Sequence, residues 1–94
     1  MYVRISRIQF DPDKYDEVME IVRDVPELMR RQPGFVGYFA AAERTAGTGL
    51  AVSTWETEEK AWVSRAVLGD IVPRMHALGV KLDAPEVYEI IVQV

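Results

Sequence analysis

The sequence contains no cysteine, no asparagine and only one histidine among its 94 residues. Without cysteine, neither a disulfide nor a thiolate zinc site can stabilise so short a chain. No cluster of metal-ligating side chains is visible either, so we predict no bound metal. The absence of cysteine is compatible with a reducing compartment, and we expect the protein in the cytoplasm.

An excess of positive charge and a long hydrophobic run are also missing. The chain has 11 lysines and arginines against 15 aspartates and glutamates, which gives a net charge of −4. Because phosphate neutralisation supplies most nucleic-acid affinity, a mildly acidic chain is a poor nucleic-acid binder. No run of about 18 apolar residues could cross a bilayer, and residues 1–10 lack the apolar core of a secretory signal. We therefore expect neither nucleic acid nor a membrane as a partner.

Apolar residues, in contrast, are plentiful, since 49% of the chain is hydrophobic and 28% is charged. A chain of this length is expected to form one domain over residues 1–94 and to bury only about 60–65% of its unfolded surface. Such an apolar surplus on a small body predicts association, with a sheet face or edge buried against a second copy.

The first half of the chain predicts a strand, a broken helix and a second strand. The strand covers residues 2–10, and a phase shift in its apolar pattern indicates either a bulge or apolar contacts on both faces. Asp11-Pro12 begins a helix as N-cap and first helical residue. The helical spacing continues, although Pro26 should kink or split this helix. After a Pro-Gly turn, a second strand is expected over residues 35–43.

The second half predicts a hairpin, another broken helix and a final strand. A turn at residues 45–49 leads into a third strand over residues 50–56. Thr57 is a good N-cap for the helix that follows. A glycine interrupts this helix, and Asp70 is expected to cap its second segment. The final strand is expected over residues 87–94, whose apolar run suits a strand covered on both sides.

The resulting order, β-α-β-β-α-β, is that of the ferredoxin-like α+β folds. In these folds both helices cover one face of a four-stranded antiparallel sheet. The other face remains bare, and here it would be apolar because the outer strands carry apolar residues on both sides. This face is expected to pack against a partner sheet.

Three stretches carry a resemblance to a known family: the helix-to-strand junction at residues 32–38, the strand-to-helix segment with an early tryptophan at residues 52–62, and the terminal strand from Val87. With them, nearly the whole chain resembles the antibiotic biosynthesis monooxygenase family of the dimeric α+β barrel superfamily. The resemblance implies a homodimer through the sheet faces and the C-terminal strand. Some members oxidise aromatic polyketides without metal or flavin, others degrade heme, and others have no assigned reaction.

Oxidation without a cofactor has simple requirements. An electron-rich phenolate can pass an electron to O₂, so the protein needs an apolar pocket, a group that favours deprotonation and donors for the oxygenated intermediate. The resemblance implies that Trp55 lies beside the substrate and that His76 acts as a base or, in heme-degrading relatives, as an iron ligand. The plainer interpretations are a core or interface anchor for Trp55 and a helix-terminal surface residue for His76.

Polar side chains on the strands are the other candidates. Arg4 and Arg7 lie on opposite faces of the first strand by parity, so one of them could bind a phenolate or carboxylate in a pocket. A surface ion pair is the alternative, and the pattern leaves the choice open. The residues whose polar tips could bind a substrate are Tyr38, Ser53, Trp62 and Tyr88. Arg65 and Arg74 are expected either to rim a pocket mouth or to pair with Glu58 and Asp70.

Two functions of different classes therefore compete. The first is a cofactor-independent monooxygenase that acts on small aromatic or polyketide-like substrates. The second is a non-catalytic dimeric barrel that binds a small apolar or aromatic ligand. Heme binding or degradation is a third possibility, resting on His76 alone.

Overall fold

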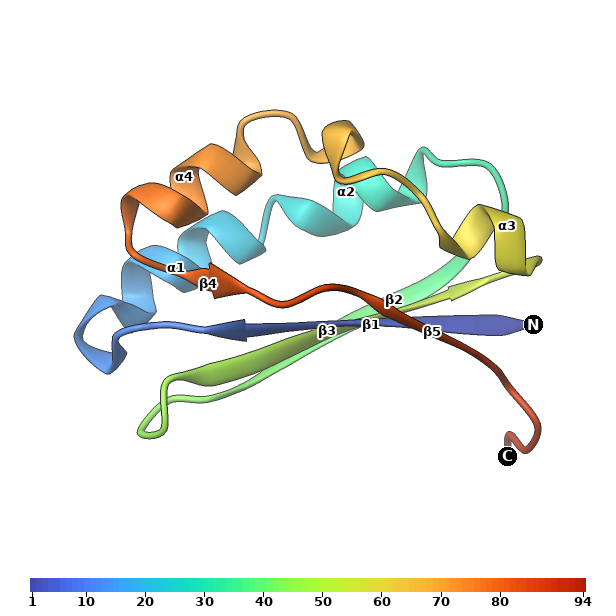
Figure 1. The fold of residues 1–94 in the computed structure, drawn as a ribbon, viewed down its shortest axis with the longest axis horizontal. Coiled ribbons are helices and arrows are strands. Elements are labelled where there is room, and N and C mark those ends of the chain that lie inside the picture. The colour runs from blue at the N-terminus through green and yellow to red at the C-terminus, as the bar shows by residue number, and fades with distance from the viewer.

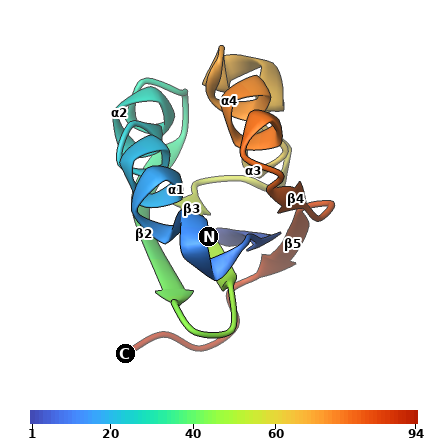
Figure 2. The same cartoon turned by 90° about the vertical axis from the view of Figure 1, so that its left-hand side faces the viewer.

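The computed structural model describes residues 1–94 and places helices α1 to α4 on one face of a single sheet (Figure 1, Figure 2). The strands are β1 (Tyr2–Gln9), β2 (Phe35–Glu43), β3 (Thr48–Trp55), β4 (Lys81–Leu82) and β5 (Glu86–Glu89), and every pair is antiparallel. Their order is β2-β3-β1, with β4 and β5 following one another along the free edge of β1. The predicted ferredoxin-like α+β fold is confirmed, with one correction. The fourth strand position is filled by two short strands, so the sheet has five strands instead of four.

Each crossover between strands is a broken helix, as predicted. The first contains a 3₁₀ turn (Pro12–Lys14), α1 (Tyr15–Val22) and α2 (Val25–Arg30), and the break between the two helices lies just before Pro26. The second contains α3 (Glu58–Ala61), a 3₁₀ turn (Arg65–Leu68) and α4 (Ile71–Ala77). None of the helices has the length and apolar character needed to span a bilayer.

Two of the three predicted helix caps are present. The Asp11 carboxylate accepts a hydrogen bond from the Asp13 N–H at 2.9 Å, and the Thr57 hydroxyl accepts one from the Lys60 N–H at 3.2 Å. The predicted cap at Asp70 is wrong, because its side chain makes no capping bond. Its backbone is already helical (φ −82°, ψ −1°), whereas a capping side chain normally projects from an extended residue.

The pairing of β1 with β3 is regular from Tyr2 opposite Trp55 to Gln9 opposite Thr48, without a bulge. The phase shift in the sequence therefore reflects apolar contacts on both faces. Arg4 is buried on the helix side, where Ile8 also packs against the core, while Ile5 and Arg7 alternate onto the other face. The bulge lies in β2 instead, between Phe35 and Gly37.

The core between sheet and helices is small, since only 13 of the 94 residues are buried. Trp55 and Val18 are its fully buried large side chains, and the ring of Phe35 meets the indole of Trp55 edge-on at 5.6 Å. Large apolar side chains remain at the surface, among them Phe39, which is 59% exposed on the sheet face opposite the helices. The chain on its own thus leaves much of its apolar surface uncovered.

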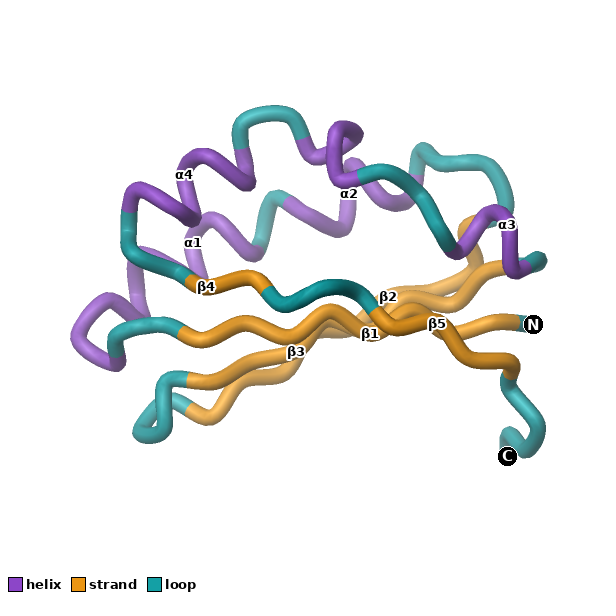
Figure 3. Tube along the Cα trace, viewed as in Figure 1, coloured by secondary structure: helices purple, strands orange, loops and turns teal.

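The predicted final strand over residues 87–94 is wrong in its second half. Pairing ends at Glu89 opposite Tyr2, and the last backbone bond runs from the Ile90 N–H to the Met1 carbonyl at 3.0 Å. Beyond this point β1 offers no further partner, so residues 91–94 leave the sheet as an exposed segment (Figure 3). We call residues 90–94 the C-terminal tail. It runs away from the sheet on the side opposite the helices (Figure 1).

Candidate active site

A partly open cavity of about 530 Å³ lies between the sheet and the helices. Strands β1, β2 and β3 form its floor, and residues of α1, α2 and α4 form its walls, with Arg65 and Leu68 between α3 and α4. The two rows of helices stand side by side over the sheet (Figure 2). Of the 25 lining residues, 18 are hydrophobic. A cavity of this size and character is typical of a site for a small, largely apolar molecule.

Arg4 is the most deeply buried charged residue of the site. Its side chain crosses from the middle of β1 to the second crossover, where Nη1 donates to the carbonyls of Ala61 at 3.0 Å and Val63 at 2.6 Å. Its Nε is buried and has no partner. Burial, with the nearby charge of Arg65 as a second cause, lowers the pKa of Arg4 from its ordinary value.

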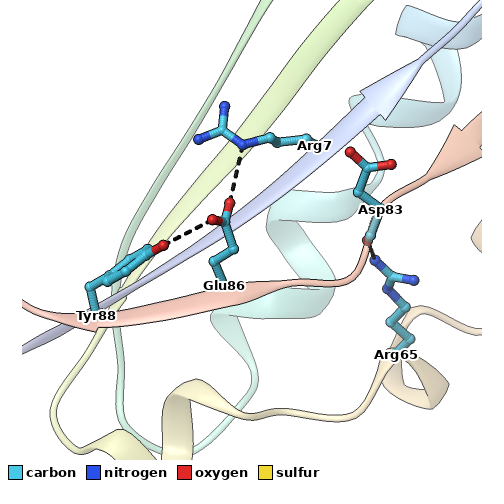
Figure 4. Close-up of polar contacts among 5 residues, drawn as sticks. All are labelled: Arg7, Arg65, Asp83, Glu86 and Tyr88. Carbon is cyan, nitrogen blue, oxygen red and sulfur yellow. Dashed lines mark hydrogen bonds and ion pairs between the residues drawn. The ribbon is translucent and has the colours of Figure 1, made fainter.

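Arg65 and Arg7 are two further arginines close to the cavity, and their side chains are held differently (Figure 4). Arg65 donates to the backbone carbonyl of Asp83 and forms no ion pair with a carboxylate. The alternative pairing of Arg65 with Glu58 is therefore not observed. Arg7 lies on the other face of β1 and pairs with Glu86, Nε to Oε2 at 3.1 Å.

Two hydroxyl groups on the floor of the cavity can donate to a ligand. Burial raises the pKa of Tyr38 to about 12, so its phenol stays protonated at neutral pH and can donate but not accept a proton. Ser53 Oγ accepts a hydrogen bond from Trp55 Nε1 at 2.8 Å, which leaves the serine proton free for a second partner. Both groups were predicted from the sequence, and the structure brings them together with Arg4 in one cavity.

Four predicted site residues lie outside the cavity lining. Trp55 is fully buried in the core between the sheet and the helices, whereas His76, Trp62 and Tyr88 are exposed. Tyr88 donates to Glu86 Oε1 at 2.9 Å on the bare sheet face (Figure 4). These positions favour the plainer interpretations of Trp55 as a core anchor and His76 as a surface residue.

Heme ligation through His76 finds no support in this arrangement. The imidazole is exposed on α4 and lines neither the main cavity nor the smaller one at the β2–β3 hairpin. It is also the only histidine of the chain. No group of three or more histidine, aspartate or glutamate side chains is placed to hold a metal ion. The residues present therefore do not fit a heme held by an axial histidine.

Sequence reasoning missed some lining residues. Ser6 lies two positions after Arg4 and faces the same side of β1, so the parity of the strand could have identified it. Arg23, between α1 and α2, and Tyr15, at the start of α1, also contribute to the wall. No motif distinguishes these two from ordinary helix residues.

The fold and the apolar cavity define a small α+β protein of the ferredoxin-like type with a partly open cavity between its sheet and its helices. The chain belongs to the antibiotic biosynthesis monooxygenase family, whose model matches residues 1–73. No protein among the curated sequences matches the chain.

Solved structures show the same fold at low sequence identity. A Deinococcus radiodurans protein of the antibiotic biosynthesis monooxygenase type superimposes with a TM-score of 0.78 and 13% identity, covering 100% of this chain and 96% of that one. SnoaB from Streptomyces nogalater, a cofactor-independent oxygenase, gives 0.68 and 17% over 99% and 95% of the two chains. A mutant of MhuD with two manganese protoporphyrin IX molecules bound per active site gives 0.69 and 17% over 100% and 98%.

Proposed function

We propose that this chain is a cofactor-independent monooxygenase that oxidises a small aromatic or polyketide-like phenol in the cavity with O₂. The observation that carries the proposal is a largely apolar cavity, partly open to solvent, in which the charged groups are all cationic and the hydroxyls can donate. Such a site favours the phenolate over the phenol, since positive charge and hydrogen-bond donors stabilise the developing anion in a water-poor space. Family membership and the fold shared with a cofactor-independent oxygenase support the same reaction.

The proposed reaction balances without a further reductant. The phenolate transfers an electron to O₂, and the resulting pair combines at the unsubstituted para carbon to give a peroxide. The O–O bond then breaks as the para hydrogen leaves. One oxygen atom remains on the ring as a quinone carbonyl, and the other leaves as water with the two hydrogens that the substrate has lost. Arg4 and Tyr38 are the groups of this chain best placed to hold the anionic oxygens.

Oxygen consumption by the purified protein with 1-naphthol or anthrone tests the proposal. We expect one quinone formed for each O₂ consumed. Ala51 lines the floor of the cavity, and Ala51→Phe should fill the space and abolish turnover. Ala46, in the exposed hairpin turn outside the cavity, provides the matched control, since Ala46→Phe should retain turnover. If neither substrate is consumed by a protein whose circular dichroism shows it to be folded, the proposal fails.

One observation favours the second candidate, a non-catalytic ligand-binding protein. The cavity lining contains no histidine, aspartate or glutamate, so no side chain of neutral pKa is present to accept the phenol proton. A binding protein would take up the same aromatic molecules without consuming oxygen. Calorimetric titration with 1-naphthol under nitrogen, compared with oxygen uptake in air, separates the two candidates.

We further propose that the chain works as a homodimer, in the cytoplasm, with its bare sheet face and C-terminal tail against a second copy. Phe39, Ile5 and Val52 lie across this face in one row of the sheet, and Ile91 and Val92 of the tail are 86% and 80% exposed. An exposed apolar row on a sheet face suits burial in a two-fold symmetric interface with a second copy.

Sedimentation equilibrium tests the dimer. We expect Phe39→Asp to dissociate the wild-type dimer and to lower its thermal stability, because the new carboxylate would be buried at the interface. Trp62→Asp changes another exposed aromatic residue, after α3, and should leave the dimer intact. A folded wild-type monomer at micromolar concentration would contradict the proposal.

A further inference from the structure

Methionine is concentrated on the walls of the cavity. The chain has four methionines, and Met19 of α1, Met29 of α2 and Met75 of α4 line the cavity. The lining holds about a quarter of the residues of the chain but three of its four methionines. The fourth, Met1, lies at the N-terminus, outside the lining, and is 47% exposed. The thioether groups of the chain are thus divided between the cavity and one position that faces solvent.

The three methionines of the lining are not equivalent. Met29 and Met75 are buried members of the hydrophobic core, and core packing accounts for both of them. Met19 is only partly buried and packs against the margin of this core. With Tyr15 and Val22 it forms a row at i, i+4 and i+7 along α1, and all three residues of the row line the cavity. Met19 is therefore the thioether most open to a molecule held in the cavity.

No other kind of side chain in the lining readily takes up an oxygen atom from a peroxide. The chain has no cysteine, and neither its single histidine nor its tryptophans line the cavity. A methionine sulfur accepts an oxygen atom from a peroxide to give methionine sulfoxide, which is polar where methionine is apolar. In this cavity methionine alone supplies such a sulfur atom.

We propose that Met19 is a modification site, at which an organic peroxide held in the cavity deposits an oxygen atom on the sulfur. This inference rests on the proposed function, because the peroxide is the one formed there on the substrate. In the main course that peroxide loses water and gives the quinone. In the competing course its O–O bond breaks, and the outer oxygen is transferred to the sulfur. The sulfur is oxidised by two electrons, and the inner oxygen keeps the peroxide proton and stays on the substrate as a hydroxyl group.

The modification would stop further turnover. The sulfoxide would place a polar group in a wall of the cavity, where 18 of the 25 lining residues are hydrophobic. An apolar ligand bound against this wall would leave the sulfoxide oxygen without a hydrogen-bond partner, which weakens binding. Methionine sulfoxide reductases reverse this oxidation. Met19 would thus limit the release of peroxide from the site, at the cost of a reversible loss of activity.

Two peroxides of different polarity test the site without any turnover. Met1 and Met19 fall in different tryptic peptides, so mass spectrometry measures the sulfoxide at each position. The ratio of the two within one chain cancels the intrinsic reactivity of the oxidant. We expect hydrogen peroxide to oxidise Met1 before Met19, in the order of their exposure. Cumene hydroperoxide is apolar and aromatic, so it should enter the cavity and raise the ratio of Met19 to Met1 at least about tenfold.

Variants locate the effect in the cavity and at the sulfur. Ala51→Phe fills the cavity and should abolish the rise in the ratio, whereas Ala46→Phe, in the exposed hairpin turn, should retain it. Met19→Leu keeps a side chain of similar volume without the sulfur. In the wild type, treatment with cumene hydroperoxide should weaken the binding of 1-naphthol, measured by calorimetry under nitrogen, and Met19→Leu should prevent this loss.

Three results would overturn the proposal. They are an equal ratio of the two sulfoxides with both peroxides, a rise in the ratio that survives Ala51→Phe in a folded protein, and a Met19→Leu variant that loses 1-naphthol binding as readily as the wild type. The last two are independent, so the test remains decisive if Ala51→Phe does not fold.

Turnover of 1-naphthol in the presence of catalase separates this proposal from the proposed function. Catalase removes free hydrogen peroxide, so sulfoxide at Met19 must then come from a peroxide inside the cavity. Quinone formation without sulfoxide at Met19 would overturn the modification site while the monooxygenase stands. Selective oxidation of Met19 by cumene hydroperoxide, without oxygen consumption by any phenol, would refute the monooxygenase and leave Met19 as a site for apolar peroxides.

Discussion

The hydrogen bond between Trp55 and Ser53 joins the fully buried indole to the cavity floor, and its removal has a calculable effect. Trp55 Nε1 donates to Ser53 Oγ at 2.8 Å, and both residues are buried. Ser53→Ala leaves the indole N–H without an acceptor and should cost about 1–3 kcal/mol of unfolding free energy. For a domain of this length each kcal/mol corresponds to about 4–8 °C in Tm, so the loss is easy to detect.

A double-mutant cycle isolates this bond from the packing of the two side chains. Trp55→Phe removes the donor, so adding Ser53→Ala to it should cost much less than Ser53→Ala costs in the wild type. We expect a coupling of about 1 kcal/mol or more, measured by urea unfolding at one fixed protein concentration. Ser6→Ala, also on the cavity floor, is the control and should cost the same in both backgrounds. Equal costs of Ser53→Ala with and without the indole would refute the reasoning.

Three further predictions concern turns and titrating groups. In urea unfolding, Gly47→Ala should lower the unfolding free energy by at least about 1 kcal/mol more than Gly79→Ala does. Both glycines have a positive φ, but only at Gly47 would the new Cβ lie 2.2 Å from a backbone oxygen. The hydrogen bond from Tyr88 is the main cause that lowers the pKa of Glu86. The stabilisation from this hydrogen bond is present above the usual carboxyl pKa and is lost as the pH falls through the lowered pKa of Glu86. Tyr88→Phe should therefore raise the Glu86 pKa, which NMR titration measures. An unchanged pKa would contradict Tyr88 as the main cause. Burial raises the pKa of Tyr38 to about 12. The protonated phenol therefore contributes to the free energy of unfolding in full below a pH of about 10, and this contribution is lost as the pH rises toward 12. Ultraviolet titration should lose its highest tyrosine step in Tyr38→Phe.

Local signals in the sequence were sufficient for most of the fold. Thr57 caps its helix, and Pro26 follows the break between α1 and α2, because capping and the missing proline N–H act within a few residues. The end of the sheet depends on distant residues instead. The tail has the β-branched apolar composition of a strand, but its partner β1 begins at Tyr2, so the pairing stops there. Pro85 lies between β4 and β5. Because β4 has only two residues, it is too short to show the alternating apolar pattern by which a strand is predicted.

The site could be predicted only in part, for a similar reason. Parity placed Arg4 and Arg7 on opposite faces, but the apolar phase shift hid which of them faces the helices. Register against β3 determines this, and register is a property of the whole sheet. Arg65 and Arg74 look alike in the sequence. In the structure Arg74 pairs with Asp24 and Asp70, while Arg65 meets only a carbonyl at the cavity.

The central position of β1 also affects how the chain folds during its synthesis. β1 is synthesised before all the strands that flank it, since it pairs with β3 on one edge and with β4 and β5 on the other. Its second edge therefore stays open until residues 81–89 have been made, and contacts between such distant segments form slowly. Until then a nascent chain exposes an apolar strand edge, the kind of edge that pairs with other chains. We expect the domain to complete folding late and in one step, with its last strands closing the sheet around the first.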